Sequence, residues 1–315
     1  MISNIIFSII LFLSLGFFSF NLWKIIRNIR LGKSEDRFDH PLKRLKILLK
    51  VAFGQTKLFA RPISGLLHAL VYWGFLVITI GTLEMMIDGV FNVERSLKFL
   101  GQFYDFVIAS GDIMAVVVLF ACFIFIFRRL FLRIKRFSGK EMKKSSSFDA
   151  VNALLIIILL MISLLTMNIG YIGSSTDIFG EYPVSNYLIY FFNDFNMRLL
   201  HDISWWAHII LVLLFLNELP YSKHFHVVMS IPNVYFSNIQ NLGKMNNMNK
   251  VTSEVKLMLD PNSNLENDDK IDNNTIETFG AKDVRDLNWV QLMNAYSCTE
   301  CGRGTAESPA NQTGK

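Results

Sequence analysis

The sequence predicts an all-α membrane protein: a bundle of five transmembrane helices, followed by a polar linker and a short cysteine-containing segment. Hydrophobic residues make up 52% of the 315 residues and charged residues only 18%, which argues against a disordered chain and an ordinary soluble domain. The long apolar runs lie almost entirely before residue 238, whereas the remainder is rich in Asn, Asp and Lys. We therefore divide the chain into a membrane domain (1–237), a linker (238–278) and a C-terminal segment (279–315).

Five segments can form bilayer-spanning helices, each of which takes about 20 mostly apolar residues. They are residues 2–23, 63–87, 103–127, 148–172 and 201–219. The first is expected to be a signal anchor. No basic region precedes its apolar run, and no small-residue cleavage site follows it.

The distribution of Lys and Arg predicts the orientation of these spans. The connection over residues 24–61 holds eleven and that over 128–147 holds eight, whereas the connections before the third and fifth spans hold two and one. Because basic residues gather in cytoplasmic loops, we expect the N-terminus outside and the C-terminal part in the cytoplasm. The net charge of +5 then reflects topology, and no nucleic-acid partner is expected.

Residues 40–60, in the first basic connection, mix five Lys and Arg residues with Leu, Ile and Val. An amphipathic helix on anionic lipid headgroups explains this pattern, and so does a solvated basic loop. The sequence leaves both interpretations open.

Histidines are the main functional candidates. Five of the six lie in or beside the second and fifth spans: His68, His201, His208, His224 and His226. An ionisable residue inside a membrane is costly and marks a candidate functional site, and a neutral imidazole is a good axial ligand for haem iron. The alternative is that these imidazoles only bond to neighbouring carbonyls or cap a span at the interface.

Depth in the membrane groups these histidines. His68 lies near the start of the second span, while His224 and His226 follow the fifth, so all three lie near the cytoplasmic face. One haem can therefore be held between His68 and either His226 or His224. His208 lies deeper, where the second span offers Ile78 and no histidine.

Helix rotation gives a further, conditional expectation. If the fifth helix continues past Pro220, a rotation of about 100° per residue places His201, His208 and His226 on one stripe. His224 then points almost the opposite way. Pro220 can also kink the helix and loosen this relation.

Other polar residues in the spans are weaker candidates. His201 is either an interfacial residue or part of a quinone pocket with Asp202, Trp205 and Trp206, and an aromatic belt explains the two tryptophans equally well. Three further residues are interpreted mainly as satisfied packing or boundary residues: Glu84, Asp112 and Asn168. Proton uptake is the alternative for Asp112 and Asn168.

The C-terminal segment contains an incomplete cluster motif. Cys298 and Cys301 match the first half of the bacterial [4Fe–4S] run C-x2-C-x2-C-x3-C-P, but Gly304 and Ser308 stand at the third and fourth ligand positions, before Pro309. Glycine has no side chain to ligate iron, and serine is a rare substitute. We interpret residues 279–315 as a truncated ferredoxin-like segment that does not hold a stable cluster unaided.

Several motifs together carry a family resemblance. The second span contains Gly65-Leu-Leu-His68 and Gly81-Thr-Leu-Glu84, and the fifth is followed by Pro220-Tyr-Ser-Lys-His224-Phe-His226 and Ile231-Pro-Asn233. The tail adds Phe279-Gly-Ala-Lys-Asp-Val284, Asp286-Leu-Asn-Trp289, Cys298-Thr-Glu-Cys301-Gly-Arg303 and Pro309-Ala-Asn-Gln-Thr-Gly-Lys315. The chain resembles bacterial membrane-bound iron–sulfur-binding oxidoreductases related to heterodisulfide reductase. Its membrane domain resembles the haem b (gamma) subunit of respiratory nitrate reductase.

The resemblance implies haem b held by His68 and His226, with His208 as a candidate ligand at a second site. One haem is expected, and two is the alternative. The implied function is electron transfer, in the bacterial cytoplasmic (inner) membrane, between a cytoplasmic donor and the quinone pool. The donor would be an electron-transfer flavoprotein or a dehydrogenase, so the chain would be a subunit or fragment of an oxidoreductase.

The chain also departs from that family. The second cluster motif and the reductase module of the family are absent from the sequence. A fragment with sequence errors or a degenerate copy is favoured over a separate haem subunit whose partner supplies the clusters. Two alternative functions of a different class are a non-redox membrane anchor and a transporter, and neither explains the paired histidines. Transporters also often show internal repeats, and none is evident in this sequence.

Overall fold

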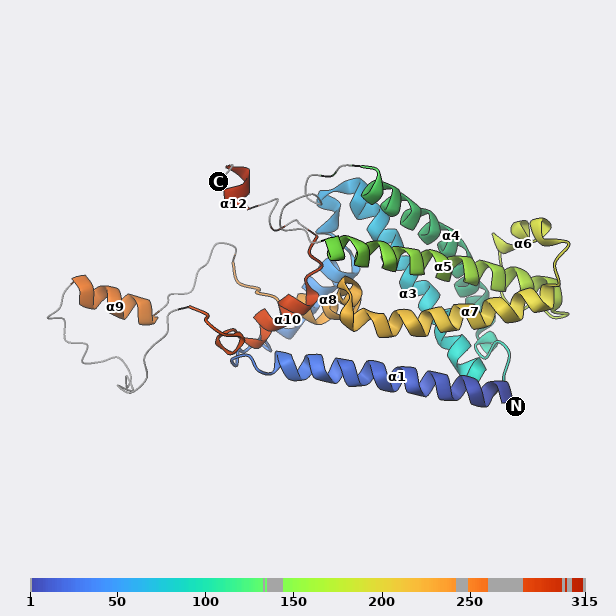
Figure 1. Ribbon diagram of the computed structural model, residues 1–315, viewed down its shortest axis with the longest axis horizontal. Coiled ribbons are helices and arrows are strands. Elements are labelled where there is room, and N and C mark those ends of the chain that lie inside the picture. The colour runs from blue at the N-terminus through green and yellow to red at the C-terminus, as the bar shows by residue number, and fades with distance from the viewer. Residues whose placement is uncertain are drawn as a thin grey trace.

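The computed structural model describes residues 2–132, 134, 144–241, 249–259, 280–301, 304 and 308–313. Within these ranges the protein is all-helical and has no strand; Lys33 and Asn288 form one isolated bridge. Five helices of the described part are long and apolar enough to cross a membrane: α1 (Ile2–Ile29), α3 (Pro62–Phe91), α4 (Gln102–Leu130), α5 (Lys144–Ser174) and α7 (Met197–Glu218). The prediction of an all-α protein with five candidate spans is confirmed (Figure 1).

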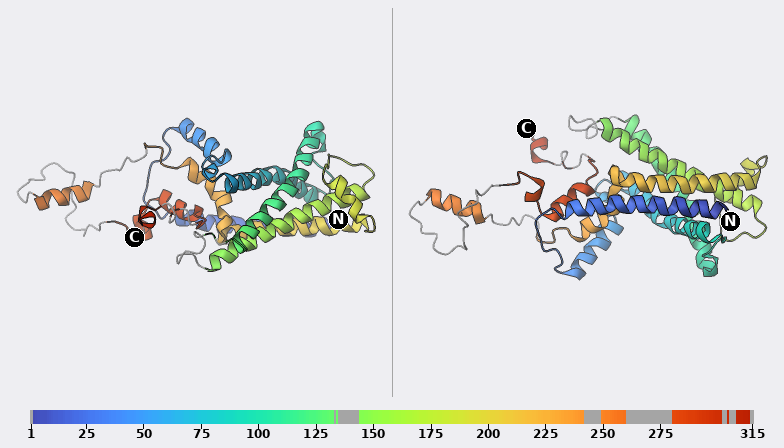
Figure 2. Two further views of the ribbon diagram at one scale, coloured as in Figure 1. Left: turned by 90° about the horizontal axis from the view of Figure 1, so that it is seen from above. Right: turned by 60° about the horizontal axis from the view of Figure 1, so that its bottom comes forward.

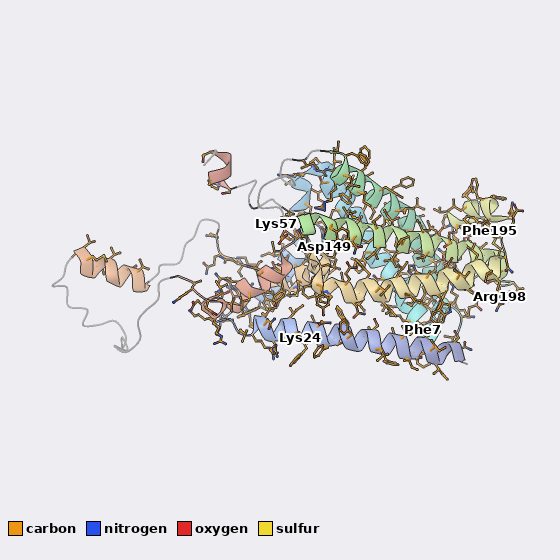
Figure 3. All side chains as sticks on the ribbon, in the orientation of Figure 1. Phe7, Lys24, Lys57, Asp149, Phe195 and Arg198 are labelled. Carbon is orange, nitrogen blue, oxygen red and sulfur yellow. The ribbon has the colours of Figure 1, made fainter. Side chains whose placement is uncertain are left out.

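The described residues also form shorter helices. They are α2 (Pro41–Leu48), α6 (Ser185–Leu188), α8 (His226–Tyr235), α9 (Asn249–Leu259), α10 (Trp289–Ser297) and α12 (Pro309–Gln312). Helices α2, α8 and α10 lie at the end of the bundle opposite to α6 and the N-terminus (Figures 1 and 2). Lys57 and Asp149 lie at the first of these ends, and Phe195 and Arg198 at the other (Figure 3).

The helices pack in the order α3, α4, α5 and α7, with α1 laid against α3 and α7. Helices α5 and α7 form the most extensive pair, and a glycine permits their close approach. A Cβ built on Gly170 would lie 2.5 Å from the backbone nitrogen of His201. Small residues let helix backbones approach in this way inside membranes, where van der Waals packing drives association.

Two carboxylates within the spans accept hydrogen bonds from the backbone of the α3–α4 and α5–α7 connections, at the same end of the bundle as the N-terminus of α1. Asp112 accepts hydrogen bonds from the backbone of Val184 (2.8 Å) and Ser185 (2.9 Å) and from the Asn168 side chain (3.1 Å). Glu84 accepts bonds from the backbone of Leu97 (3.0 Å) and from the Tyr104 hydroxyl (3.1 Å). The interpretation of these buried residues as satisfied packing residues is confirmed.

The helical form of residues 41–53 favours the amphipathic interpretation over a loop. Helix α2 continues into a short π-helical turn (Leu49–Phe53), and Leu42 and Leu49 on it are exposed. Arg44, in contrast, is buried and donates to the carbonyls of Tyr235 (3.0 Å) and Ser237 (2.9 Å) at the end of α8. This charge therefore belongs to the packing of α2 on α8, and only the outer face is available to lipid.

The fifth transmembrane helix does not continue past Pro220. Helix α7 ends at Glu218, a 3-10 turn (Leu219–Tyr221) follows, and Ser222 adopts an extended conformation with φ −112° and ψ 163°. A second 3-10 turn (Lys223–Phe225) leads into α8. The condition for a single stripe of His201, His208 and His226 is therefore not met: His201 and His208 share α7, but the helical rotation is interrupted between Glu218 and His226.

Helix α10 packs on the membrane domain. Its residues Val290 and Met293 belong to a buried apolar cluster. The other members are Ile25 of α1, Leu219 just after α7, Phe225 just before α8 and Met229 on α8. The indole nitrogen of Trp289 donates to the carbonyl of Glu35 (2.8 Å). This part of the C-terminal segment is thus fixed beside the end of α7.

Candidate functional site

The structure brings together His68 and His226, which the sequence separates widely. His68 lies in the second turn of α3, a helix that begins with Pro62, and His226 is the first residue of α8. Their ring centroids are 6.2 Å apart, and the ring planes are inclined by 42°. The break at Ser222 turns the chain so that the start of α8 faces the start of α3.

The orientation of the His226 ring is set by a backbone carbonyl. Its Nδ1 lies 2.9 Å from the carbonyl oxygen of Lys223. A carbonyl only accepts hydrogen bonds, so we assign the proton to Nδ1, and Nε2 keeps its lone pair. Metal-ligating histidines are commonly oriented in this way, with the second ring nitrogen bonded to a carbonyl or a carboxylate.

His224 lies beside this pair. Its ring centroid is 5.9 Å from that of His226 and 6.2 Å from that of Phe215. Its Nδ1 is buried and has no hydrogen-bond partner within the described ranges. Burial, chiefly, lowers the pKa of His224 to about 4. Burial also lowers the pKa of His226, against the opposing effect of its bond to Lys223. Both imidazoles are thus neutral near pH 7, which is the form that ligates metals.

The spacing of His68 and His226 would allow both imidazoles to bind one metal ion. Nitrogen ligands lie about 2 Å from a bound metal, so two opposed imidazoles place their ring centroids about 6 Å apart, close to the observed 6.2 Å. Two donors suit a metal whose other ligands come with it, as the iron of haem does. The described residues contain no group of three or more His, Cys, Asp or Glu side chains that could hold a metal ion by themselves.

His208 occupies a different place. It is 1% exposed, and its Nδ1 lies 3.0 Å from the Ser163 hydroxyl and 3.1 Å from the Leu160 carbonyl oxygen of α5. Its Nε2 is buried without a hydrogen-bond partner in the described part of the chain. His208 precedes the last residue of α7 by ten positions, a rise of about 15 Å, so it is not grouped with His68 and His226. No sequence signal pointed to Ser163.

His201 and the two tryptophans make contacts with different parts of the bundle. His201 lies 3.3 Å from the Asp202 carboxylate, and its ring centroid is 6.1 Å from that of Tyr171. The ring centroids of Trp205 and Trp206 lie 5.4 Å and 6.2 Å from that of Phe7. The tryptophans therefore pack α7 against α1.

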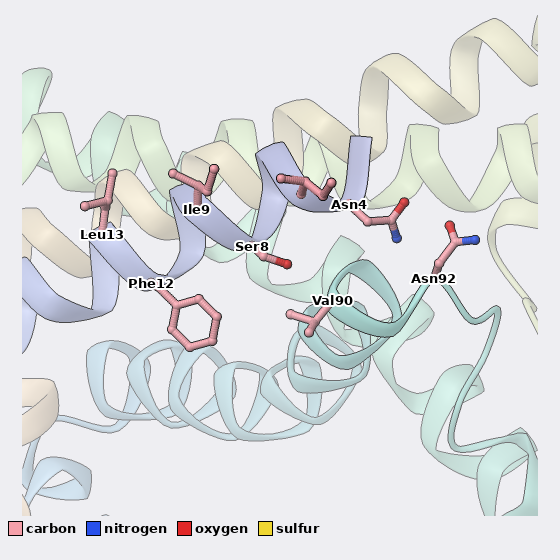
Figure 4. A pocket seen from close by; sticks show the side chains of 8 residues that line it. Asn4, Ser8, Ile9, Phe12, Leu13, Val90 and Asn92 are labelled. Carbon is pink, nitrogen blue, oxygen red and sulfur yellow. The ribbon is translucent and has the colours of Figure 1, made fainter. Parts of the chain in front are cut away.

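An open groove of about 730 Å³ lies between α1 and the end of α3 (Figure 4). Its lining is mainly apolar, with three polar residues: Asn4, Ser8 and Asn92. Val90, which also lines it, follows His68 by twenty-two positions along α3, a rise of about 33 Å. The groove and the histidine pair therefore lie at opposite ends of the bundle.

Cys298 and Cys301 are both exposed and follow the end of α10. Between them, Glu300 forms an ion pair with Lys223, with 2.8 Å between Nζ and Oε2. Of the two positions where the cluster motif lacks cysteine, Gly304 is exposed and Ser308 is partly buried. Phe279 and Arg303, which the sequence motifs include, lie outside the described residues.

Comparison with known proteins gives two similar relatives. The chain is 28% identical, over 91% of its length and 37% of the relative's, to "Probable iron-sulfur-binding oxidoreductase FadF" of Bacillus subtilis (strain 168). It is 24% identical, over 98% of its length and 40% of the relative's, to "EtfAB:quinone oxidoreductase" of Syntrophomonas wolfei subsp. wolfei. These similarities support an iron–sulfur oxidoreductase family.

The chain spans about two fifths of the length of these curated relatives. No family model matches it, and no solved structure does. The similarity supports electron transfer in general terms, and one of the two relatives is named as quinone-linked.

Proposed function

We propose that this chain is the membrane part of a quinone-linked electron-transfer oxidoreductase that holds one haem b between His68 and His226. The observation that carries the proposal is the pair of imidazoles of His68 and His226, whose ring centroids lie 6.2 Å apart although they come from two helices distant in sequence. When bound, haem b supplies one-electron redox chemistry. A non-redox membrane anchor has no use for this pair.

The residues of the chain would bind and orient the group. His68 on α3 and His226 on α8 are the residues that would hold the haem iron. The Lys223 carbonyl fixes the tautomer of His226, and a hydrogen bond of this kind also raises the basicity of a ligand. His208 is not assigned to this haem, and ligation of a second haem by it remains the alternative.

The proposed orientation places the histidine pair near the cytoplasmic face of a bacterial inner membrane. The two basic connections, with eleven and eight Lys and Arg, supply the support, because such loops stay in the cytoplasm. The N-terminus would then lie outside the cell. Helix α10 and the Cys298–Cys301 segment that follows it (the cysteine turn) would lie in the cytoplasm.

The proposed partners are a membrane quinone, membrane lipid and a cytoplasmic donor such as an electron-transfer flavoprotein or a dehydrogenase. The name of the Syntrophomonas relative joins an Etf protein with a quinone, and this supports both redox partners. For iron–sulfur clusters, Cys298 and Cys301 supply two thiolates where four are needed. We therefore propose that a [4Fe–4S] cluster there requires thiolate ligands from outside these 315 residues, because the remaining cysteine among them, Cys122, is buried in α4.

The test is a dithionite-reduced minus air-oxidised absorption spectrum of purified, haem-replete protein, with the haem-to-protein ratio. We expect one b-type haem per chain, and its loss in His68→Ala and His226→Ala. His40→Ala is the matched control, because His40 is an exposed histidine outside the spans. No haem in the unsubstituted protein would overturn the proposal and leave an anchor or a degenerate copy. Two haems per chain would overturn the single-site assignment.

A further inference from the structure

Lys223 makes three contacts, each with a different part of the molecule. Its backbone N–H donates to the Asp149 carboxylate at the start of α5 (2.9 Å). Its carbonyl accepts the bond from Nδ1 of His226 (2.9 Å). Its ammonium group pairs with Glu300, which lies between Cys298 and Cys301 (2.8 Å). One residue thus touches the bundle, a proposed haem ligand and the cysteine turn.

We infer that Lys223 is a positioning residue, which ties the conformation of the Cys298–Cys301 turn to the orientation of the His226 imidazole. The inference rests on the proposed function, because it concerns the ring that would ligate haem. The His226 ring is bonded to the Lys223 carbonyl, while the backbone N–H of the same residue is bonded to Asp149 and its ammonium group is paired with Glu300.

A second set of bonds joins α8 to the end of α10, where the Cys298–Cys301 turn begins. The side-chain amide of Asn233, on α8, donates to Asn294 and to Ser297 at the end of α10, both at 2.7 Å. The apolar faces of these helices meet through Met229 and Met293. Because α8 begins at His226, a shift of the cysteine turn is expected to reach the ring through Lys223 and through the helix itself.

The backbone conformation of Glu300 is unfavourable, and its ion pair with Lys223 helps to stabilise it. Glu300 has φ +47°, in the left-handed region that residues with a side chain enter only at an energetic cost. The ion pair with Lys223 opposes that cost. Loss of the ion pair is therefore expected to change the backbone conformation of the Cys298–Cys301 turn and the position of Lys223.

The experiment compares haem-loaded full-length variants by electron paramagnetic resonance of the ferric form and by reduction potential. The g values of low-spin ferric haem respond to the angle between its two imidazole planes. The variants are Lys223→Met, Lys223→Arg, Glu300→Gln and the double Lys223→Met/Glu300→Gln. The matched control is Lys33→Met, because Lys33 pairs with Asp286 (3.7 Å) at another junction between tail and membrane domain.

We expect Lys223→Met and Glu300→Gln to shift the largest g value in the same direction, with no further shift in the double variant. Lys223→Arg should restore the unsubstituted spectrum, and Lys33→Met should not differ from it. A pure charge effect predicts instead opposite shifts of reduction potential in Lys223→Met and Glu300→Gln, with unchanged g values, and would overturn the inference.

Two other results separate this inference from the proposed function. Haem that binds with unaltered g values in every variant would overturn the positioning role alone. Failure of the unsubstituted protein to bind haem would overturn the proposed function, and the inference with it. A spectrum changed in Lys223→Met but not in Glu300→Gln would place the effect in Lys223 itself and exclude the tie to the cysteine turn.

Discussion

At the scale of single residues, the structure distinguishes two histidines that the sequence treats alike. His224 and His226 are two positions apart, and both lie close to the proposed haem site. The ring of His226 lies 6.2 Å from that of His68, with the two planes inclined by 42°, and its Nδ1 is bonded to a backbone carbonyl. The ring of His224 instead packs beside Phe215.

This difference predicts that His224→Ala keeps the haem and that His226→Ala loses it. Removal of the His224 ring leaves both proposed ligands and the Lys223 carbonyl in place. The measurement is the haem-to-protein ratio after expression under identical haem-replete conditions. The assignment of His226 as the ligand is wrong if His224→Ala is the variant without haem.

At the scale of helices, close approach depends on where small residues lie. Gly170 on α5 faces the backbone of His201 on α7, at a distance that excludes a Cβ. Gly81 on α3 has nothing within 4 Å of the same hypothetical atom. Both glycines are inside transmembrane helices, so their substitution has a similar effect on helix propensity.

We expect Gly170→Ala to destabilise the protein by about 1–3 kcal/mol, the usual cost of forcing an extra group into a packed interface. Gly81→Ala should be neutral or stabilising by up to about 1 kcal/mol, because alanine favours helix over glycine. Unfolding in detergent, followed by circular dichroism, measures both. Equal stability of the two variants would show that the α5–α7 contact is not tight.

At the scale of the whole molecule, basic connections and the histidine pair share one end of the bundle. Lys57 lies in the first basic connection, and Glu94 lies in the connection between α3 and α4 at the other end; both are exposed. The proposed orientation puts Glu94 outside the cell and Lys57 inside.

Cysteine labelling tests that orientation. With Cys298 and Cys301 changed to Ser, a cysteine introduced by Glu94→Cys should react with a membrane-impermeant maleimide in intact cells. A cysteine introduced by Lys57→Cys should react only after the cells are permeabilised, and the remaining native thiol, Cys122, is buried. The reverse pattern would invert the topology.

The sequence was sufficient for features that depend on local composition. Long apolar runs predict the five spans, and the depth of His68 relative to residues 224 and 226 predicts that they meet. Depth along the spans could not decide between His224 and His226, because their contacts depend on how the chain turns at Ser222; only the family resemblance implied His226. It also missed the docking of α10 and the role of Asp112 at α6, since these contacts join residues far apart in the chain.

The position of His68 near the start of α3 has an energetic consequence. Pro62 opens that helix, and six residues later the rise is about 9 Å, a third or less of a hydrocarbon core of about 30 Å. A charge that crosses the whole membrane exchanges about 2.3 kcal/mol for each 100 mV. An electron passing between a cytoplasmic donor and a centre at this depth crosses a small part of that field, so its equilibrium should respond only weakly to the energisation of the cell.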